Sequence, residues 1–462
     1  MDLTEDDVAQ GDVLQGKKFH GRDGVSKTGS YVPPVLIPKT IKKNGTYDPT
    51  DDNADGYSSV EVDVTGVGIK VTDPIAYRAA NRDPNYPDVP LPSEITDNGD
   101  WFYLLYSAKD KFVCPTFQLN GGTLISAKRC KYLNKTLIAE SDISLVLGTN
   151  YYREQFDSDD SDWGDYNYIL YKINISGATT IAFYNYTYNG TESNASQSSC
   201  LIEASIKATN LTTATIYASN LRHYDLEYFS MTGYKGNTAA NMFRGCSALK
   251  AICELETPNA TNMTYMFYQC YSLQAIPLFD TSNVTNMANM FYDCHSLTTI
   301  PSLNTANVTS MASMFRNCRV LETIPKLDTA NVTNMAYMFA QCNILGAIPN
   351  LSTPLVNTLQ NMLESCFNLQ SVGTLNFSSV SSLVSLDPYG YLYSLVSFNA
   401  TGMKASFRLS GSNFLSESAI VVILNNLATV STTQTLTLGA TNLAKLTAEE
   451  KAIATNKGWT LA

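Results

Sequence analysis

Six cysteines recur at a fixed interval in the second half of the chain, and a thiol can bind a metal, form a disulfide or act as a nucleophile. They stand 24 residues apart, at Cys246, Cys270, Cys294, Cys318, Cys342 and Cys366. If successive repeats stack like parallel strands, neighbouring Cα atoms lie about 4.8 Å apart with parallel Cβ bonds, outside disulfide geometry. A straight column does not converge on one metal ion. Because free cysteine is among the most buried residue types, the spacing predicts a reduced ladder in the core.

Other groups that carry chemistry in enzymes are scattered. The three histidines stand in different segments, at His20, His223 and His295. No nucleophile motif accompanies them, so catalysis centred on histidine is not supported. The run Gly11–Lys18 begins like a P-loop, but Lys18 replaces the Ser or Thr that holds magnesium, which predicts a surface turn. The acidic run Asp157–Asp165 lacks the Gly and Glu of an EF-hand loop, which favours a solvated loop over a calcium site.

These patterns lead us to expect no catalytic residues, no cofactor and no bound metal, and hence no enzyme. One alternative stays open. Paired carboxylates, the machinery of glycoside hydrolases, leave no distinctive spacing in a sequence, and no segment of this chain stands out for them.

Tyrosines are the candidates for ligand contact, because flat rings stack on sugar faces. A first group holds Tyr151, Tyr152, Tyr166, Tyr168 and Tyr171. A second group lies in the repeats, together with one arginine, and holds Tyr265, Tyr268, Tyr292, Arg316 and Tyr337. The alternative is that tyrosines in strands are β-formers that pack half buried. The residue types of the second group vary from repeat to repeat, as exposed positions do.

The elements that position these residues repeat with the same 24-residue period. Met-Phe recurs from Met242 to Met338, cysteine follows, and then come Leu-x-x-Ile and, in four repeats, proline. One such coil cannot bury enough apolar surface to offset the entropy lost on ordering, so the coils must stack into a solenoid. We expect Leu-x-x-Ile to form a strand that ends at the proline, and Met-Phe-x-x-Cys to form a turn or short helix opposite.

The fold class predicted from these patterns is mainly β and multi-domain. Composition changes along the chain mark an N-terminal β module, a proline-rich linker, a β-sandwich-like domain, a solenoid of about six coils and a small α/β cap, at residues 1–72, 73–99, 100–235, 236–385 and 386–462. In the cap we expect a helix around Ile420–Leu427, a strand at Gln434–Leu438 and a helix that opens with the capping box Thr447-x-x-Glu450.

Charge and hydropathy argue against further classes of function. The formal net charge is −11, which argues against general binding of nucleic acid or of a membrane surface. The start of the chain is acidic and has no apolar core segment, and no stretch approaches the roughly 20 apolar residues of a spanning helix. We therefore expect assembly in a cytoplasm, with reduced thiols.

The repeat Met-Phe-x-x-Cys…Leu-x-x-Ile…Asn-Val-Thr-Asn-Met resembles the leucine-rich-like repeats of bacterial surface adhesins and lipoproteins, and the C-terminal Leu-Thr-Leu-Gly…Gly458-Trp459 resembles the segment that closes such repeats. The N-terminal pieces Asp12–Phe19 and Asn44–Asp48 are similar to modules of phage tail, baseplate and fibre proteins. Together these features resemble a phage virion appendage.

That resemblance implies a structural virion protein, a head or tail fibre or decoration. It would attach to other virion proteins through residues 1–72 and bind a host-surface glycan or protein. Fibres of this kind are symmetric homo-oligomers, for which a trimer is our expectation. The alternatives are a bacterial cell-surface adhesin and a polysaccharide-degrading appendage.

Overall fold

The structure is a computed structural model. It describes residues 18–20, 26–28, 60–62, 69–71, 73–108, 113–148, 152–153, 166–187, 201–216, 225–380 and 386–462. The chain divides into two compact units, Met1–Tyr77 and Arg78–Ala462. In the first unit two antiparallel pairs are described: β1 (Lys18–His20) with β2 (Ser26–Thr28), and β3 (Val60–Val62) with β4 (Ile69–Val71). The predicted mainly β class is confirmed, with about 10% helix and 30% strand.

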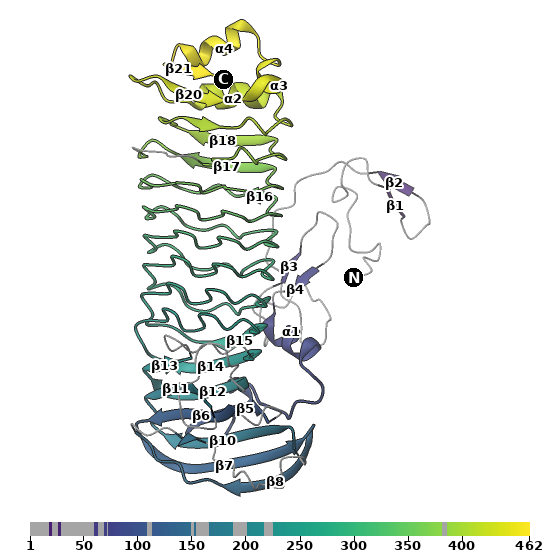
Figure 1. The fold of residues 1–462 in the computed structure, drawn as a ribbon, viewed down its shortest axis with the longest axis vertical. Coiled ribbons are helices and arrows are strands. Elements are labelled where there is room, and N and C mark those ends of the chain that lie inside the picture. The colour runs from purple at the N-terminus through teal and green to yellow at the C-terminus, as the bar shows by residue number, and fades with distance from the viewer. Residues whose placement is uncertain are drawn as a thin grey trace. The chain divides into compact units, whose positions relative to one another are not determined.

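The second unit contains a β-solenoid of about ten turns over residues 203–461 (Figure 1). Its first coils pair in parallel through β12 (Leu201–Leu211), β14 (Tyr228–Tyr234) and β15 (Ala251–Leu255). Its last coils pair in parallel through β16 (Ala347–Ile348), β17 (Ser371–Asn376) and β18 (Ser397–Thr401), and then through β19 (Phe407–Arg408), β20 (Gln434–Thr437) and β21 (Trp459–Leu461). The stack therefore extends beyond the 236–385 repeat at both ends, because parallel pairing continues where the sequence signature has faded.

Between β15 and β16 the coils contain no named strand, although residues 256–346 are all described. They touch through single bridges such as Asn286↔Ser310 and Ser310↔Asn334. The expected Leu-x-x-Ile strand is thus reduced to a two-residue strand or to none in these coils. Proline has no N–H to donate to the ladder, and it follows the isoleucine at Pro277, Pro301, Pro325 and Pro349.

Side chains of the Asn-Val-Thr segment join coil to coil in place of the missing ladder. The amide nitrogen Nδ2 of Asn307 donates to the carbonyl oxygen of Ser282 at 2.7 Å, and Oγ1 of Thr309 donates to the carbonyl oxygen of Thr285 at 3.0 Å. Equivalent bonds recur at Asn283, Asn331, Thr285 and Thr333. The Asn-x-Thr triplets are therefore structural, with side chains bonded to the neighbouring coil.

The larger of two apolar cores runs through the second unit, and it includes a column of phenylalanines. Phe243, Phe267, Phe291, Phe315 and Phe339 are fully buried, and consecutive rings stack with centroids 5.4–5.8 Å apart and interplanar angles of 2–8°. This spacing matches offset-stacked rings. The column therefore joins equivalent positions of successive coils.

Two sheets share this core at the N-terminal end of the solenoid. The seven-stranded sheet has the order β15-β14-β12-β5-β10-β7-β8, and the four-stranded sheet has the order β13-β11-β6-β9. The additional strands are β5 (Asp100–Ser107), β6 (Val113–Asn120), β7 (Thr123–Leu133), β8 (Thr136–Asp142), β9 (Tyr152–Arg153), β10 (Tyr168–Ser176), β11 (Thr180–Thr187) and β13 (Thr213–Thr215). Because β12 pairs with both β5 and β14, the sandwich-like part and the solenoid form one continuous sheet.

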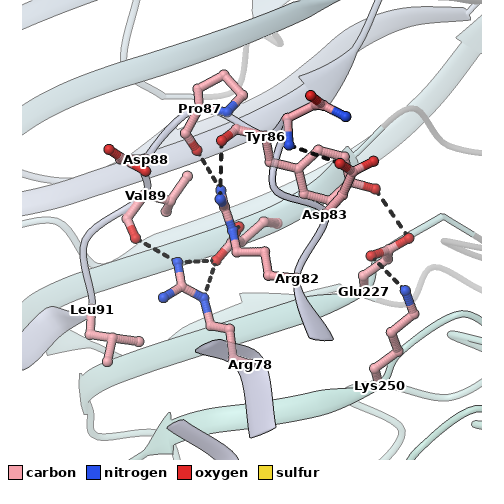
Figure 2. Close-up of polar contacts among 12 residues, drawn as sticks. Arg78, Arg82, Asp83, Tyr86, Pro87, Asp88, Val89, Leu91, Glu227 and Lys250 are labelled. Carbon is pink, nitrogen blue, oxygen red and sulfur yellow. Dashed lines mark hydrogen bonds and ion pairs between the residues drawn. The ribbon is translucent and has the colours of Figure 1, made fainter. Parts of the chain in front are cut away.

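A strap, defined as residues 78–95, lies on the outer face of that sheet and includes the end of α1 (Pro74–Asn81). Arg78 and Arg82 of the strap, both labelled in Figure 2, converge on one carboxylate, that of Glu203 on β12. Nε of Arg78 lies 2.6 Å from Oε1 of Glu203, and Nε of Arg82 lies 2.8 Å from Oε2. The Glu203 side chain is only 3% exposed, so two cations compensate one buried anion.

The rest of the strap packs through an apolar patch and a second polar contact. Tyr86 and Val89 join Leu105 and Tyr168 in a small core on this outer face. The hydroxyl of Tyr86 donates to Glu227 at 3.2 Å, as Figure 2 also shows. The proline-rich stretch interpreted as a linker is therefore packed structure from residue 78 to residue 95.

The C-terminal coils carry α2 (Glu417–Asn426), α3 (Gly439–Leu443) and α4 (Ala448–Thr455). The predicted capping box is confirmed: Oγ1 of Thr447 accepts from the Glu450 N–H at 3.2 Å, and Oε2 of Glu450 accepts from the Thr447 N–H at 2.8 Å. The indole of Trp459, 2% exposed, donates to the carbonyl oxygen of Ala428 at 2.8 Å. These contacts close the apolar core at its C-terminal end.

Candidate ligand-contact face of the solenoid

The Met-Phe-x-x-Cys segment forms a run of turns with two left-handed residues in each coil. One stands before the methionine and the other before the cysteine, with φ between 52° and 75°. The first set is Asn241, Tyr265, Asn289, Ser313, Tyr337 and Asn361. The second set is Gly245, Gln269, Asp293, Asn317, Gln341 and Ser365. A non-glycine residue rarely adopts this conformation, so its recurrence needs a compensating interaction.

Backbone hydrogen bonds supply that compensation, because successive N–H groups along the turn donate alternately to the next coil and to their own coil. The Phe267 N–H donates to Met290 of the next coil at 2.9 Å, whereas the Met266 N–H donates to Met263 of its own coil at 3.3 Å. The same alternation recurs in the coils above and below. As a result phenylalanine and cysteine point into the core, whereas Tyr268 is half buried and Tyr271 is 37% exposed.

No disulfide joins the six repeat cysteines, and their exposure is 0%. The thiols of the last five donate to phenylalanine carbonyl oxygens of the preceding coil at 3.0–3.2 Å. Burial raises the pKa of Cys270 and Cys294 well above the ordinary thiol range. A protonated thiol already used as a donor is neither a nucleophile nor a metal ligand.

Apart from the cysteines, the structure brings the second predicted group, the tyrosines and the arginine of the repeats, together across successive coils. The guanidinium carbon of Arg316 lies 5.5 Å from the ring centroid of Tyr292 and 4.7 Å from that of Tyr337. Tyr292 stacks on Tyr268 with ring centroids 4.8 Å apart. Arg244 lies 5.0 Å and 5.2 Å from the Tyr268 and Tyr265 centroids. We call Arg244, Tyr265, Tyr268, Tyr292, Arg316 and Tyr337 the Arg–Tyr ladder.

A polar cluster borders this ladder and centres on Asp293. Its carboxylate accepts from Asn317 and, at 3.4 Å, from Gln269, and lies 3.6 Å from Nε2 of His295. Burial and the Arg319 guanidinium lower the pKa of His295 below its ordinary value, although Asp293 acts in the opposite direction. His295 is therefore neutral at pH 7, and its ring stacks on Tyr271 with centroids 4.9 Å apart.

The first tyrosine group has a different fate. Tyr166, Tyr168 and Tyr171 are buried, at 6%, 2% and 0% exposure, and Tyr171 packs edge-on against Phe117. They are core residues with no exposed ring face. Tyr152 stacks on Phe117 at 5.0 Å, and Tyr151 lies outside the described residues.

Several other candidates lie outside the described residues: Gly11–Lys17, Asp157–Asp165 and His223. Lys18 and His20 belong to β1, of which only the backbone is described. Within the described part of the chain, no three or more His, Cys, Asp or Glu side chains gather where they could hold a metal ion. None of its helices has the length and apolar character needed to cross a membrane.

Sequence reasoning missed Arg244 and Asp293. The available signal was the period itself: Arg244 stands 24 residues before Tyr268, in the same column as Tyr292 and Arg316. Asp293 occupies the left-handed position before Cys294. Reading every column of the repeat, and not the aromatic positions alone, identifies both residues.

Comparison with known proteins locates this face within a recognised repeat. Residues 237–344 and 298–386 match the family described as Mycoplasma protein of unknown function, DUF285. The two DUF285 matches overlap and together include the whole Arg–Tyr ladder, but they span less than half of the chain. No curated protein matched the chain. The chain is thus a repeat-containing protein whose DUF285-like part is the solenoid that carries the candidate face.

Proposed function

We propose that this protein is a structural, non-catalytic component of a phage particle, a head or tail fibre or related appendage, whose solenoid binds glycans or proteins of a host surface or its surroundings. The observation that carries the binding role is the Arg–Tyr ladder. Its six side chains lie in mutual ring and cation–π contact across five coils. Tyrosine and arginine are the residue types that dominate binding hot spots, because they combine large area with directional polar groups.

The physical character of the ladder supports recognition more than stability. The six side chains of the ladder are half buried, and a cation–π contact contributes between about 0.5 and 2 kcal/mol, less than the roughly 3–5 kcal/mol at stake in each fully buried phenylalanine of the column. Tyr265 and Tyr337 also occupy left-handed backbone positions, where asparagine or serine stands in the other coils. Folding alone therefore does not require tyrosine at these two positions.

The virion assignment draws on the N-terminal motifs, and attachment to other virion proteins is proposed for residues 1–72, with a trimer as the working oligomer. Immunogold labelling of purified particles, with antibody against residues 237–380, tests it. Gold on the head or the tail would support the proposal and locate the appendage. Unlabelled particles from lysates in which the same antibody detects the protein would overturn it.

A binding assay tests the display role separately. Fluorescent full-length protein should label intact host cells, and Tyr292→Ala/Arg316→Ala should weaken labelling about tenfold or more, since each lost hot-spot contact costs above about 1 kcal/mol. Phe414→Ala, a 71% exposed residue of the C-terminal coils, is the matched control. Equal labelling by the ladder variant and the wild type would remove the ladder from the binding role.

A second candidate is a bacterial cell-surface adhesin, which the match to a Mycoplasma family favours. Fractionation of a bacterium that carries the gene distinguishes the two. Protein on the surface of uninfected cells would favour the adhesin, and protein found only in particles would favour the virion component.

A further inference from the structure

A second aromatic surface lies further along the stack, beyond the Arg–Tyr ladder. After Ser247 in the first coil, the repeat position that follows the cysteine forms a column of Tyr271, His295, Arg319, Asn343 and Phe367 in successive coils, and Tyr391 stands 24 residues after Phe367. Inter-coil bonds hold this column together: the Ser296 N–H donates to Tyr271, and the Asn368 N–H donates to Asn343, both at 3.1 Å. All the side chains in the column are aromatic or carry planar polar groups.

At the C-terminal end of this column four rings gather, Phe367, Tyr389, Tyr391 and Tyr393, which we call the platform. Ring centroids lie 5.3 Å apart for Tyr389 and Tyr391, 5.7 Å for Tyr391 and Tyr393, and 5.7 Å for Phe367 and Tyr391. Phe367 and Tyr393 are parallel to within 10°. Three of the rings are well exposed, Tyr389 at 57%, Tyr393 at 47% and Phe367 at 38%. Core packing therefore does not account for these rings.

Buried hydrogen bonds hold the loop that carries the platform. The carboxylate of Asp387, 0% exposed, accepts from the backbone N–H groups of Tyr389, at 3.3 Å, and of Tyr391. Gly390 between them has φ of +75°, and Ser412 donates to the carbonyl oxygen of Leu392 at 2.9 Å. Rings fixed before binding lose little entropy when a ligand arrives, which matters most for ligands that bind weakly through each contact.

We propose that the platform binds the pyranose rings of an extended polysaccharide, with the chain directed along the column toward Asn343 and Arg319. This inference deepens the proposed display function and rests on it.

Three features favour a carbohydrate polymer as the occupant. The platform offers ring faces with phenolic hydroxyls at their edges, which suits the apolar faces and hydroxyl rims of sugars, and the exposed Arg408 side chain lies beside it at Gly390. Phe367 and Tyr391 stand one period apart with ring centroids 5.7 Å apart, and the column before them repeats at the coil spacing of about 4.8 Å, so contacts can repeat along the axis as the units of a polymer do. Beyond the rings, the exposed Arg319 supplies guanidinium hydrogen-bond donors.

The test uses full-length protein on an array of immobilised bacterial capsular and O-antigen polysaccharides, followed by affinity electrophoresis with the soluble form of any polysaccharide bound. Tyr389→Ala/Tyr393→Ala should weaken binding about tenfold or more. Tyr389→Phe/Tyr393→Phe, which keeps the ring faces, should retain most of it. Because the Tyr389 and Tyr393 rings are both exposed, thermal unfolding should show the same midpoint for the two variants and the wild type.

The outcomes separate this inference from the display function. Wild-type binding to no polysaccharide, or equal binding by the Ala variant and the wild type, would overturn the platform. If the Ala variant still labels host cells while Tyr292→Ala/Arg316→Ala does not, the platform fails and the ladder stands. If wild-type protein labels no host cells yet binds polysaccharide through the platform, the display function fails in its stated form and the platform remains.

Discussion

The thiol of Cys318 donates a hydrogen bond to the carbonyl oxygen of Phe291, 3.0 Å away in the preceding coil. The same bond joins four other cysteine–phenylalanine pairs of the stack. It explains why the core position holds cysteine, which combines a small apolar volume with a weak donor. Without this donor the inward-facing carbonyl groups would be buried with one hydrogen bond fewer.

The first prediction concerns the reactivity of these thiols. All six repeat cysteines are fully buried, and in the last five burial raises the pKa and the S–H group is engaged, so none of the six should react with a maleimide at pH 7 in the native protein. All six should react after denaturation in guanidinium chloride. Peptide mass spectrometry of both samples measures this, and native labelling or a disulfide among the six would contradict a buried, reduced column of cysteines.

A second prediction addresses the phenylalanine column. Phe315→Ala should lower the free energy of unfolding by about 3–5 kcal/mol, because it removes two stacked contacts and leaves a cavity. Phe414→Ala, at a 71% exposed position, should change it by less than about 0.5 kcal/mol. Urea denaturation followed by circular dichroism measures both variants, and similar losses for the two would contradict a column that joins the coils.

The buried carboxylate under the strap gives a third prediction. Glu203→Gln leaves Arg78 and Arg82 without their anion and should destabilise the strap by about 3–5 kcal/mol. Limited proteolysis should then cleave within residues 78–95 well before the solenoid. The control is Glu140→Gln, which breaks the exposed pair with Lys128 and should leave the digestion pattern unchanged. A resistant strap in Glu203→Gln would show that apolar packing alone holds it.

His295 makes the fourth prediction, a pH dependence with a definite sign. Its folded pKa is lowered by burial and by Arg319, so the unfolded state binds the proton more readily. Well above pH 6.5 the imidazole is neutral in both states, so His295 does not make the free energy of unfolding depend on pH there. As the pH falls below about 6.5 the free energy of unfolding should decrease, until the folded-state pKa is passed. Subtracting the pH profile of His295→Gln from that of the wild type isolates the effect, and a difference that rises with acidification would contradict it.

The fifth prediction tests whether Tyr337 serves binding and not folding. Tyr337→Asn places at the left-handed position the residue found in three other coils. Relief of backbone strain and loss of the Arg316 contact nearly cancel, so the free energy of unfolding should change by less than about 1 kcal/mol. Host-cell labelling should nevertheless fall. A large loss of stability would assign Tyr337 a structural role.

The periodic part of the fold was accessible from sequence because each coil repeats one pattern of inward residues. The columns of Phe, Cys and Leu, the turn at Met-Phe-x-x-Cys and the capping box at Thr447 all follow from local pattern. The strands expected at Leu-x-x-Ile were largely absent where proline follows, since pairing between coils, and not β propensity, decides whether a ladder forms.

The candidate face was only partly predictable. The aromatic positions of the Arg–Tyr ladder could be chosen because their residue types vary between coils. The buried Tyr168 and Tyr171 looked the same in sequence, yet they lie in the core. Exposure of a tyrosine in a sheet depends on which face a second layer covers, and that layer comes from distant residues, such as Phe117 against Tyr171.

The sequence by itself determined the period, the inward columns and the need for coils to stack, because these follow from spacing and from the entropy that one coil cannot offset alone. Only the tertiary structure decided where the stack ends, that the strap packs on Glu203, and that Tyr389, Tyr391 and Tyr393 meet Phe367 in one surface. Those features depend on contacts between residues far apart in the chain. No local pattern encodes such contacts.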